Sequence, residues 1–96
     1  MEKKYNFTDA EIKDMASRFK AMSEPSRLKI LRTLFSGEKC VTEIIEKTGL
    51  LQANVSKQLK ILQRNGVLAC RPAGLQRFYK ITDQSVLELC NIVCKS

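Results

Sequence analysis

Apolar residues recur with helical spacing along most of this 96-residue chain, and the spacing changes once, between residues 67 and 81. Before that point, turn signals at residues 23–25, 36–37 and 48–49 separate four amphipathic stretches. The interrupting segment has the character of two short strands, and a further helical stretch follows it. The sequence therefore predicts four helices, a β-hairpin and a fifth helix, which is a mainly α architecture.

Capping and turn residues predict where the first three helices begin. Thr8 and Glu11 have the spacing of a capping box, which predicts a first helix over roughly residues 9–22. Pro25 suits the first turn of a second helix. Thr42 is expected to cap a short third helix.

The rest of the chain is divided in the same way. The fourth helix is expected to end at residues 65–66, where an Asn-Gly pair follows its apolar stripe. Strands over 67–71 and 76–81, joined by a turn at 72–74, are expected to form the hairpin. Thr82 or Asp83 then caps the fifth helix. That helix is apolar on more than one face and is expected to be covered on two sides, by the following residues: Val86, Leu87, Leu89, Cys90, Ile92, Val93 and Cys94.

The length predicts a single domain over residues 1–96. Hydrophobic residues make up 44% of the chain and no apolar run approaches about 18 residues, so a soluble, globular protein is expected. The first six residues contain no apolar signal region, and a cytoplasmic location is expected. Because so short a domain buries a small share of its surface, we also expect a partner subunit.

The sequence contains no histidine, which removes the commonest general base and the commonest metal ligand. Zinc hydrolases and His-dependent catalytic triads are therefore excluded. The sequence also has no nucleophile paired with a base, no carboxylate pair in an apolar setting and no glycine-rich phosphate loop. We predict that the chain is not an enzyme and that it needs no obligatory cofactor.

Positive charge is concentrated in one segment. The formal net charge is +7, and the segment from residue 47 to residue 80 contains seven basic residues and no Asp or Glu. The remaining basic and acidic residues cancel. A basic segment within an otherwise neutral domain is typical of a surface that binds a polyanion. The seven are Lys47, Lys57, Lys60, Arg64, Arg71, Arg77 and Lys80.

The basic segment coincides with the predicted third and fourth helices and the hairpin. Two short helices joined by a Gly-containing turn indicate a helix-turn-helix, and a following hairpin makes it a winged helix-turn-helix. The fourth helix would be the recognition helix, with its outer face opposite Val55, Leu59 and Leu62 and with Gln58 near the edge. Amide side chains can pair with adenine, whereas Lys, Arg and Ser mostly hold phosphates. The predicted contacts with duplex DNA are Gln52, Asn54, Ser56, Lys57, Lys60, Arg71, Gln76 and Arg77, with the wing tip expected over residues 71–77.

Three segments carry a resemblance to a known family. Residues 19–31 read FKAMSEPSRLKIL, residues 54–62 read NVSKQLKIL and are followed at residues 65–68 by NGVL, and residues 76–81 read QRFYKI. In this combination the chain resembles the ArsR/SmtB repressors over about residues 10–95. The resemblance implies a homodimer that pairs through its first and fifth helices, binds operator DNA, and leaves it when a metal, metalloid or sulfur oxidant binds.

The chain departs from the family pattern at two positions that bear on DNA recognition. Leu51 stands where a Ser usually caps the fourth helix, and Gln58 stands where a His is usual. A lost cap costs about 1 kcal/mol, so the start of this helix is expected to be looser or capped differently. The operator sequence of relatives therefore does not transfer to this chain.

The inducer sites of the family do not transfer whole either. The helix-5 zinc site of some members uses His ligands, which this chain lacks. Cys40 matches the first cysteine of the arsenic-type stretch, but Thr42 and Ile45 occupy the other two positions. Persulfide-forming members have a cysteine in the second helix, where this chain has Arg32.

The inducer must therefore be argued from the chain's own cysteines, which a reducing compartment would keep as thiols. Cys90 and Cys94 are four residues apart, so both sulfurs lie on one face of the fifth helix. They could chelate a soft ion such as As(III), Sb(III), Cd(II) or Pb(II), with Cys40 as a third ligand. They could instead form a disulfide or polysulfide, or be buried as small hydrophobes, which is the interpretation we favour for Cys70.

These observations predict a homodimeric transcriptional repressor that thiol chemistry releases from DNA, with a soft metal or metalloid ion preferred as inducer. A repressor that responds to persulfide or redox change is the alternative. Because winged helices also mediate protein contacts, a protein-interaction module without operator binding is the alternative of another class.

Overall fold

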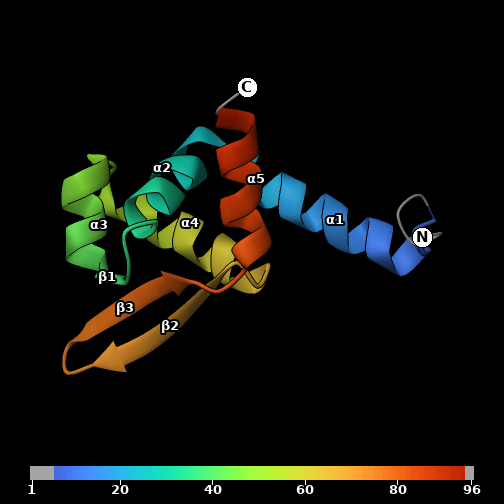
Figure 1. Cartoon of the computed structure of the whole chain (residues 1–96). Coiled ribbons are helices and arrows are strands. Elements are labelled where there is room, and N and C mark those ends of the chain that lie inside the picture. The colour runs from blue at the N-terminus through green and yellow to red at the C-terminus, as the bar shows by residue number, and fades with distance from the viewer. Residues whose placement is uncertain (1–5, 95–96) are drawn as a thin grey trace.

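The computed structural model describes residues 6–94 and contains five helices and a small antiparallel sheet. In Figure 1, α1 leads away from the other helices, and the β2–β3 hairpin extends from the body in another direction. The predicted order is confirmed. The elements are α1 (Asp9–Ala21), α2 (Pro25–Leu34), β1 (Lys39–Cys40), α3 (Val41–Thr48), α4 (Gln52–Arg64), β2 (Leu68–Ala73), β3 (Gln76–Ile81) and α5 (Gln84–Cys94).

The hydrophobic core lies where α2, α3 and α4 meet each other and the base of the hairpin. Val55, Leu59 and Leu62 form the buried face of α4, as the helical spacing predicts. This packing fixes α4 in the domain and leaves its opposite face to solvent. The fully buried side chains with the largest volumes are Ile30, Leu31, Ile44, Leu59, Leu62, Val55, Val67 and Val86.

Local hydrogen bonds fix the helix starts. The predicted capping box is present, because Glu11 N donates to Thr8 Oγ1 (3.1 Å) and Thr8 N donates to Glu11 Oε1 (2.9 Å). The expectation that Thr42 caps the third helix is wrong, since α3 begins at Val41. Cys40 occupies the cap position, and its backbone N–H donates to the Glu43 carboxylate (3.0 Å). The Glu43 carboxylate, three residues after Cys40, thus satisfies the backbone N–H of the cap residue and sets the start of α3 at Val41.

The sheet has the order β1-β3-β2, and its short strand β1 was not expected from the sequence. The predicted turn at residues 72–74 is wrong for Pro72 and Ala73 and correct for Gly74. Pro72 pairs with Arg77 and Ala73 pairs with Gln76, so β2 continues to Ala73 and the turn is Gly74-Leu75. Pro72 is tolerated because β2 is an edge strand and one side of its backbone needs no partner. Gly74 has a φ of +64°, which suits a two-residue hairpin loop.

The first helix is barely buried within the chain, since Ala21 is its only buried residue. Several large apolar side chains of α1 and α5 are exposed, including Ile12, Phe19, Ile92 and Val93. The exposed fraction of Phe19 is 56% and that of Val93 is 69%. No helix within residues 6–94 is long and apolar enough to cross a membrane.

Candidate nucleic-acid interface and thiol groove

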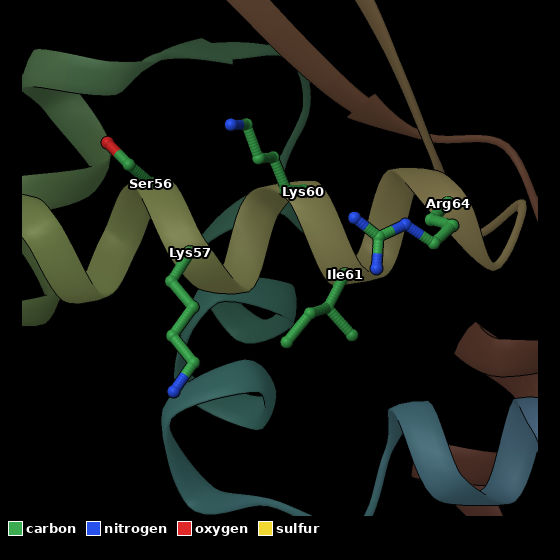
Figure 2. A pocket seen from close by; sticks show the side chains of 5 residues that line it. All are labelled: Ser56, Lys57, Lys60, Ile61 and Arg64. Atoms are coloured by element: carbon green, nitrogen blue, oxygen red, sulfur yellow. The ribbon is translucent and has the colours of Figure 1, made fainter.

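The outer face of α4 carries a shallow hollow with a basic rim. Figure 2 shows the side chains of Lys57 and Ile61 extending from one side of the helix and those of Ser56 and Lys60 from the other. Arg64 closes the row at the C-terminal end of α4. Among predicted DNA contacts, Ser56, Lys57 and Lys60 are exposed here, and Gln52 is exposed at the start of the helix. Arg64 was not among the predicted contacts, although its position four residues after Lys60 places both on one helix face.

Two amides of α4 point inward rather than outward. Gln58, expected near the edge of the outer face, is 5% exposed, and that expectation is wrong. Its Nε2 donates to Asn54 Oδ1 (2.9 Å), and Asn54 Nδ2 donates to Ser26 Oγ (3.2 Å). The physical reason is that Gln58 Oε1 accepts a hydrogen bond from buried Arg27 (2.8 Å). The carboxamide of Asn54, a predicted base reader, is therefore occupied on both sides.

The two arginines of the wing, Arg71 and Arg77, differ in their partners. Arg71 makes two hydrogen bonds to Glu38: Nε donates to Oε2 and Nη2 donates to Oε1, both at 2.8 Å. Its guanidinium carbon lies 5.0 Å from the ring centre of Phe78. The hydrogen bond from Arg71 lowers the pKa of Glu38, so this carboxylate stays ionised near neutral pH. Gln76 and Arg77 are exposed beside the turn. Within residues 6–94, Arg77 has no carboxylate partner and contacts Cys70 Sγ at 3.8 Å.

We expect Glu38→Gln to strengthen binding to duplex DNA, because it releases the Arg71 guanidinium for a phosphate. The gain should appear as a salt dependence, the slope of log K against log salt, that is steeper by about one. Fluorescence anisotropy on one duplex at several salt concentrations measures this slope.

The matched control is Glu46→Gln, which makes the same charge change at an exposed position of α3. The double variant Glu38→Gln with Arg71→Ala should lose the gain. If Glu46→Gln raises the slope equally, the effect belongs to net charge and the interpretation of Arg71 is wrong.

The two cysteines of α5 lie in a groove between α1, α2 and α5. Cys90 is half-buried and packs against the core, whereas Cys94 is exposed. Burial raises the pKa of Cys90, and the nearby Cys94 adds to the shift, so Cys90 is a neutral thiol near pH 7. The groove encloses about 650 Å³ and is mostly apolar. Its lining consists of Phe19, Met22, Leu28, Arg32, Phe35, Leu89, Cys90, Asn91, Val93 and Cys94.

The other cysteines lie elsewhere. Cys40 is buried at the junction of β1 and α3, and Cys70 is half-buried in β2. The part of the chain that the structure describes contains no group of three His, Cys, Asp or Glu side chains able to hold a metal ion. Within the described chain, Cys40 is therefore not brought together with Cys90 and Cys94 as a third ligand.

The α3-turn-α4 unit, the β2–β3 wing and the basic face of α4 define a winged helix-turn-helix DNA-binding regulator. Residues 24–69 match the family described as bacterial regulatory protein, arsR family. The chain belongs to the ArsR/SmtB family of transcriptional repressors, which are DNA-binding regulators and not enzymes.

Three comparisons illustrate the membership. An uncharacterised HTH-type transcriptional regulator of Methanocaldococcus jannaschii is 38% identical over 79 residues, which cover 81% of this chain and 89% of that protein. The antimony-specific repressor AntR has a TM-score of 0.84 at 30% identity, covering 93% of this chain and 81% of that one. A homodimeric winged helix-turn-helix domain from Mycobacterium bovis has a TM-score of 0.80 at 29% identity, covering 93% and 85%.

Proposed function

We propose that residues 1–96 form one domain that acts as a homodimer, represses transcription by holding operator DNA with α4 and the wing, and releases the operator when a soft metal or metalloid ion binds Cys90 and Cys94. The observation that carries this proposal is the location of both thiols in the apolar groove of α5, beside the surface available for a second chain.

Exposed apolar side chains support pairing through α1 and α5. Phe19 and Leu28 line the groove, and Ile92 and Val93 extend the apolar surface along α5. A monomer that leaves contiguous apolar surface in water is disfavoured, and a second copy would cover it. The structural neighbour from Mycobacterium bovis is homodimeric, which supports a dimer.

In this proposal the DNA contacts fall into two groups. Gln52, the first residue of α4, is placed to meet base edges, because recognition helices enter the major groove by their N-terminal residues, and Ser56 would hold a phosphate one turn later. Phosphates would be held by Lys57, Lys60, Arg64, Gln76 and Arg77, and by Arg71 when it leaves Glu38. Asn54 would act indirectly, by holding the position of α4.

Soft-ion chemistry fits the two sulfurs of α5. Residues four apart in a helix have Cα atoms about 6 Å apart and both side chains on one face, so two thiolates can coordinate one ion. Soft sulfur donors favour soft acceptors such as As(III), Sb(III), Cd(II) and Pb(II). The relative AntR is antimony-specific. Because Cys40 is buried away from the groove, we limit the proposed site to Cys90 and Cys94.

A sulfur switch at the same thiols is the second candidate. The helical Cα separation of about 6 Å is within the range for a disulfide, but the Cβ atoms of such a pair lie about 5–6 Å apart and a direct bridge needs about 3.5–4.5 Å, so closing it would require the last turn of α5 to unwind. Cys94, at the end of that helix, is exposed to oxidants. An organic persulfide would oxidise the two thiols to a disulfide, taking two electrons from the pair, and would itself leave as one thiol and one hydrogen sulfide molecule. Arg32, which lines the groove, replaces the cysteine that would otherwise provide a second sulfur from α2.

Replacing Cys90 and Cys94 with Ser should abolish induction and preserve DNA binding. We expect the ion or persulfide to weaken operator binding of the wild type about 5- to 150-fold, and to have no effect on the double variant. Fluorescence anisotropy on the upstream promoter DNA, titrated separately with As(III), Sb(III), Cd(II) and an organic persulfide, measures the release.

Cys70→Ser is the matched control, because it removes a thiol of the wing and should leave release intact. Release by an ion alone supports coordination, whereas release only by persulfide, reversed by dithiothreitol, supports the sulfur switch. Release that persists in the double variant would refute the assignment to these thiols.

A further inference from the structure

Arg27 is a buried cation that the proposed function does not use. Its exposed fraction is 9%, and its three donors reach three different acceptors. Nε donates to the Ala21 carbonyl (2.7 Å) and Nη2 donates to the Lys20 carbonyl (3.1 Å). Both carbonyls belong to the last turn of α1, where the helix dipole places partial negative charge. The guanidinium therefore caps the C-terminal end of α1 by donating hydrogen bonds to its last carbonyls.

The third donor of Arg27 connects that helix end to the recognition helix. Nη1 donates to Gln58 Oε1 (2.8 Å). The chain of hydrogen bonds continues from Gln58 to Asn54 and from Asn54 to Ser26, which returns it to α2. Within residues 6–94 no buried side-chain nitrogen or oxygen lacks a partner, so this network is complete. One side chain thus joins α1, α2 and α4.

Few other contacts hold α1 to its own protomer. Ala21 is the only buried residue of α1, and an ion pair between Arg18 and Asp83 (3.1 Å) links it to the start of α5. The bonds of Arg27 are thus a main determinant of the angle between α1 and α4. In a dimer that pairs through α1, this angle would determine how far apart the two recognition helices lie.

We propose that Arg27 is a positioning residue for DNA recognition, which holds α4 in the orientation that discriminates operator from other DNA. This inference rests on the proposed function, in which α4 enters the major groove. Base contacts need a defined helix angle, because paired hydrogen bonds to a base edge are directional. Phosphate contacts tolerate misorientation and carry little sequence information. Loss of the network should therefore lower specific binding and leave non-specific binding nearly unchanged.

The test uses variants that replace the buried polar pair by apolar groups of similar length. Removing both partners leaves no unpaired buried charge, although the Lys20 and Ala21 carbonyls and the Asn54 amide each lose a donor, so Arg27→Met with Gln58→Met is expected to fold and dimerise with lowered stability. The conservative variant Gln58→Glu keeps an acceptor for Arg27, and Asn54 can reverse its amide to donate to the new carboxylate. Gln58→Glu should therefore bind DNA like the wild type. If any substitution at position 58 lowered specific binding, Gln58→Glu would lower it too.

The probe is a duplex selected from a random library with the wild-type protein, compared with a scrambled duplex at the same salt. We expect the ratio of the two affinities to fall about 10-fold or more in Arg27→Met with Gln58→Met, and to be kept in Gln58→Glu. Urea unfolding and sedimentation confirm that each variant is folded and dimeric. If the double variant unfolds, Arg27→Lys provides the comparison, because it keeps the buried charge but cannot donate to the two carbonyls of α1 and to Gln58 together.

The same binding experiment distinguishes a wrong proposed function from a wrong role for Arg27. A wild-type protein that prefers no duplex would overturn the proposed function together with this inference. A wild-type preference that survives in the folded apolar variant would overturn the inference alone, and Arg27 would then have only a structural role.

Discussion

Replacing Lys57, Lys60 and Arg64 with alanine is expected to weaken DNA binding about a hundredfold or more near 0.1 M salt. The three side chains border one hollow on the exposed face of α4, so they can meet the same stretch of DNA backbone. Each lost phosphate contact removes about one released counterion, and the slope of log K against log salt should become shallower by about three. Anisotropy titrations between low and moderate salt give both quantities.

The matched control removes the same charge from α1 and α2, through Lys13→Ala, Lys20→Ala and Lys29→Ala, which are exposed positions outside the hollow. This control should shift the affinity much less at every salt concentration. Equal losses in the two triple variants would mean that overall charge, and not the face of α4, determines binding.

Leu62→Ala is expected to lower the free energy of unfolding by about 2–5 kcal/mol. Leu62 is fully buried among residues of the core, so truncation removes apolar contact and leaves a cavity under α4. This cost is a large share of the stability of an ordinary small domain. DNA binding should then fall in proportion to the folded fraction.

Urea unfolding followed by circular dichroism measures this loss, at one protein concentration because dimerisation contributes to stability. Leu75→Ala is the control, since Leu75 is fully exposed at the wing turn and its truncation should change stability by less than about 0.5 kcal/mol. A Leu62 variant as stable as the Leu75 variant would contradict the assignment of the core.

The order of the elements could be predicted because it depends on local spacing. Capping pairs such as Thr8 with Glu11 involve residues three apart, and the apolar stripes repeat within each helix. The first strand was missed because a more distant partner decides the outcome. Strand β1 exists only because Lys39 and Cys40 pair with Tyr79 and Phe78, some forty residues later. The shifted turn has a local cause, because Pro72 pairs with Arg77 and Ala73 pairs with Gln76, and these pairings extend β2 beyond the proline.

The site was predictable in its location and less so in its details. The basic face of α4 followed from helical spacing, but the inward orientation of Asn54 and Gln58 did not. Gln58 is turned inward by Arg27, 31 positions away in sequence, and Arg71 is held by Glu38, 33 positions away. A helical wheel treats every amide on the polar side as available and cannot represent such partners. Whether Cys90 and Cys94 sense an inducer remains a prediction.

The groove of Cys90 and Cys94 also contains Phe19 and Phe35, which are part of the apolar surface that a second chain would cover. The same side chains would then take part both in inducer binding and in dimerisation. A substitution that changes the response would also move the monomer–dimer balance, and the cellular abundance of the protein would shift the threshold of the switch. Evolution of a new inducer preference would therefore require compensating changes in expression level or in the apolar surface itself.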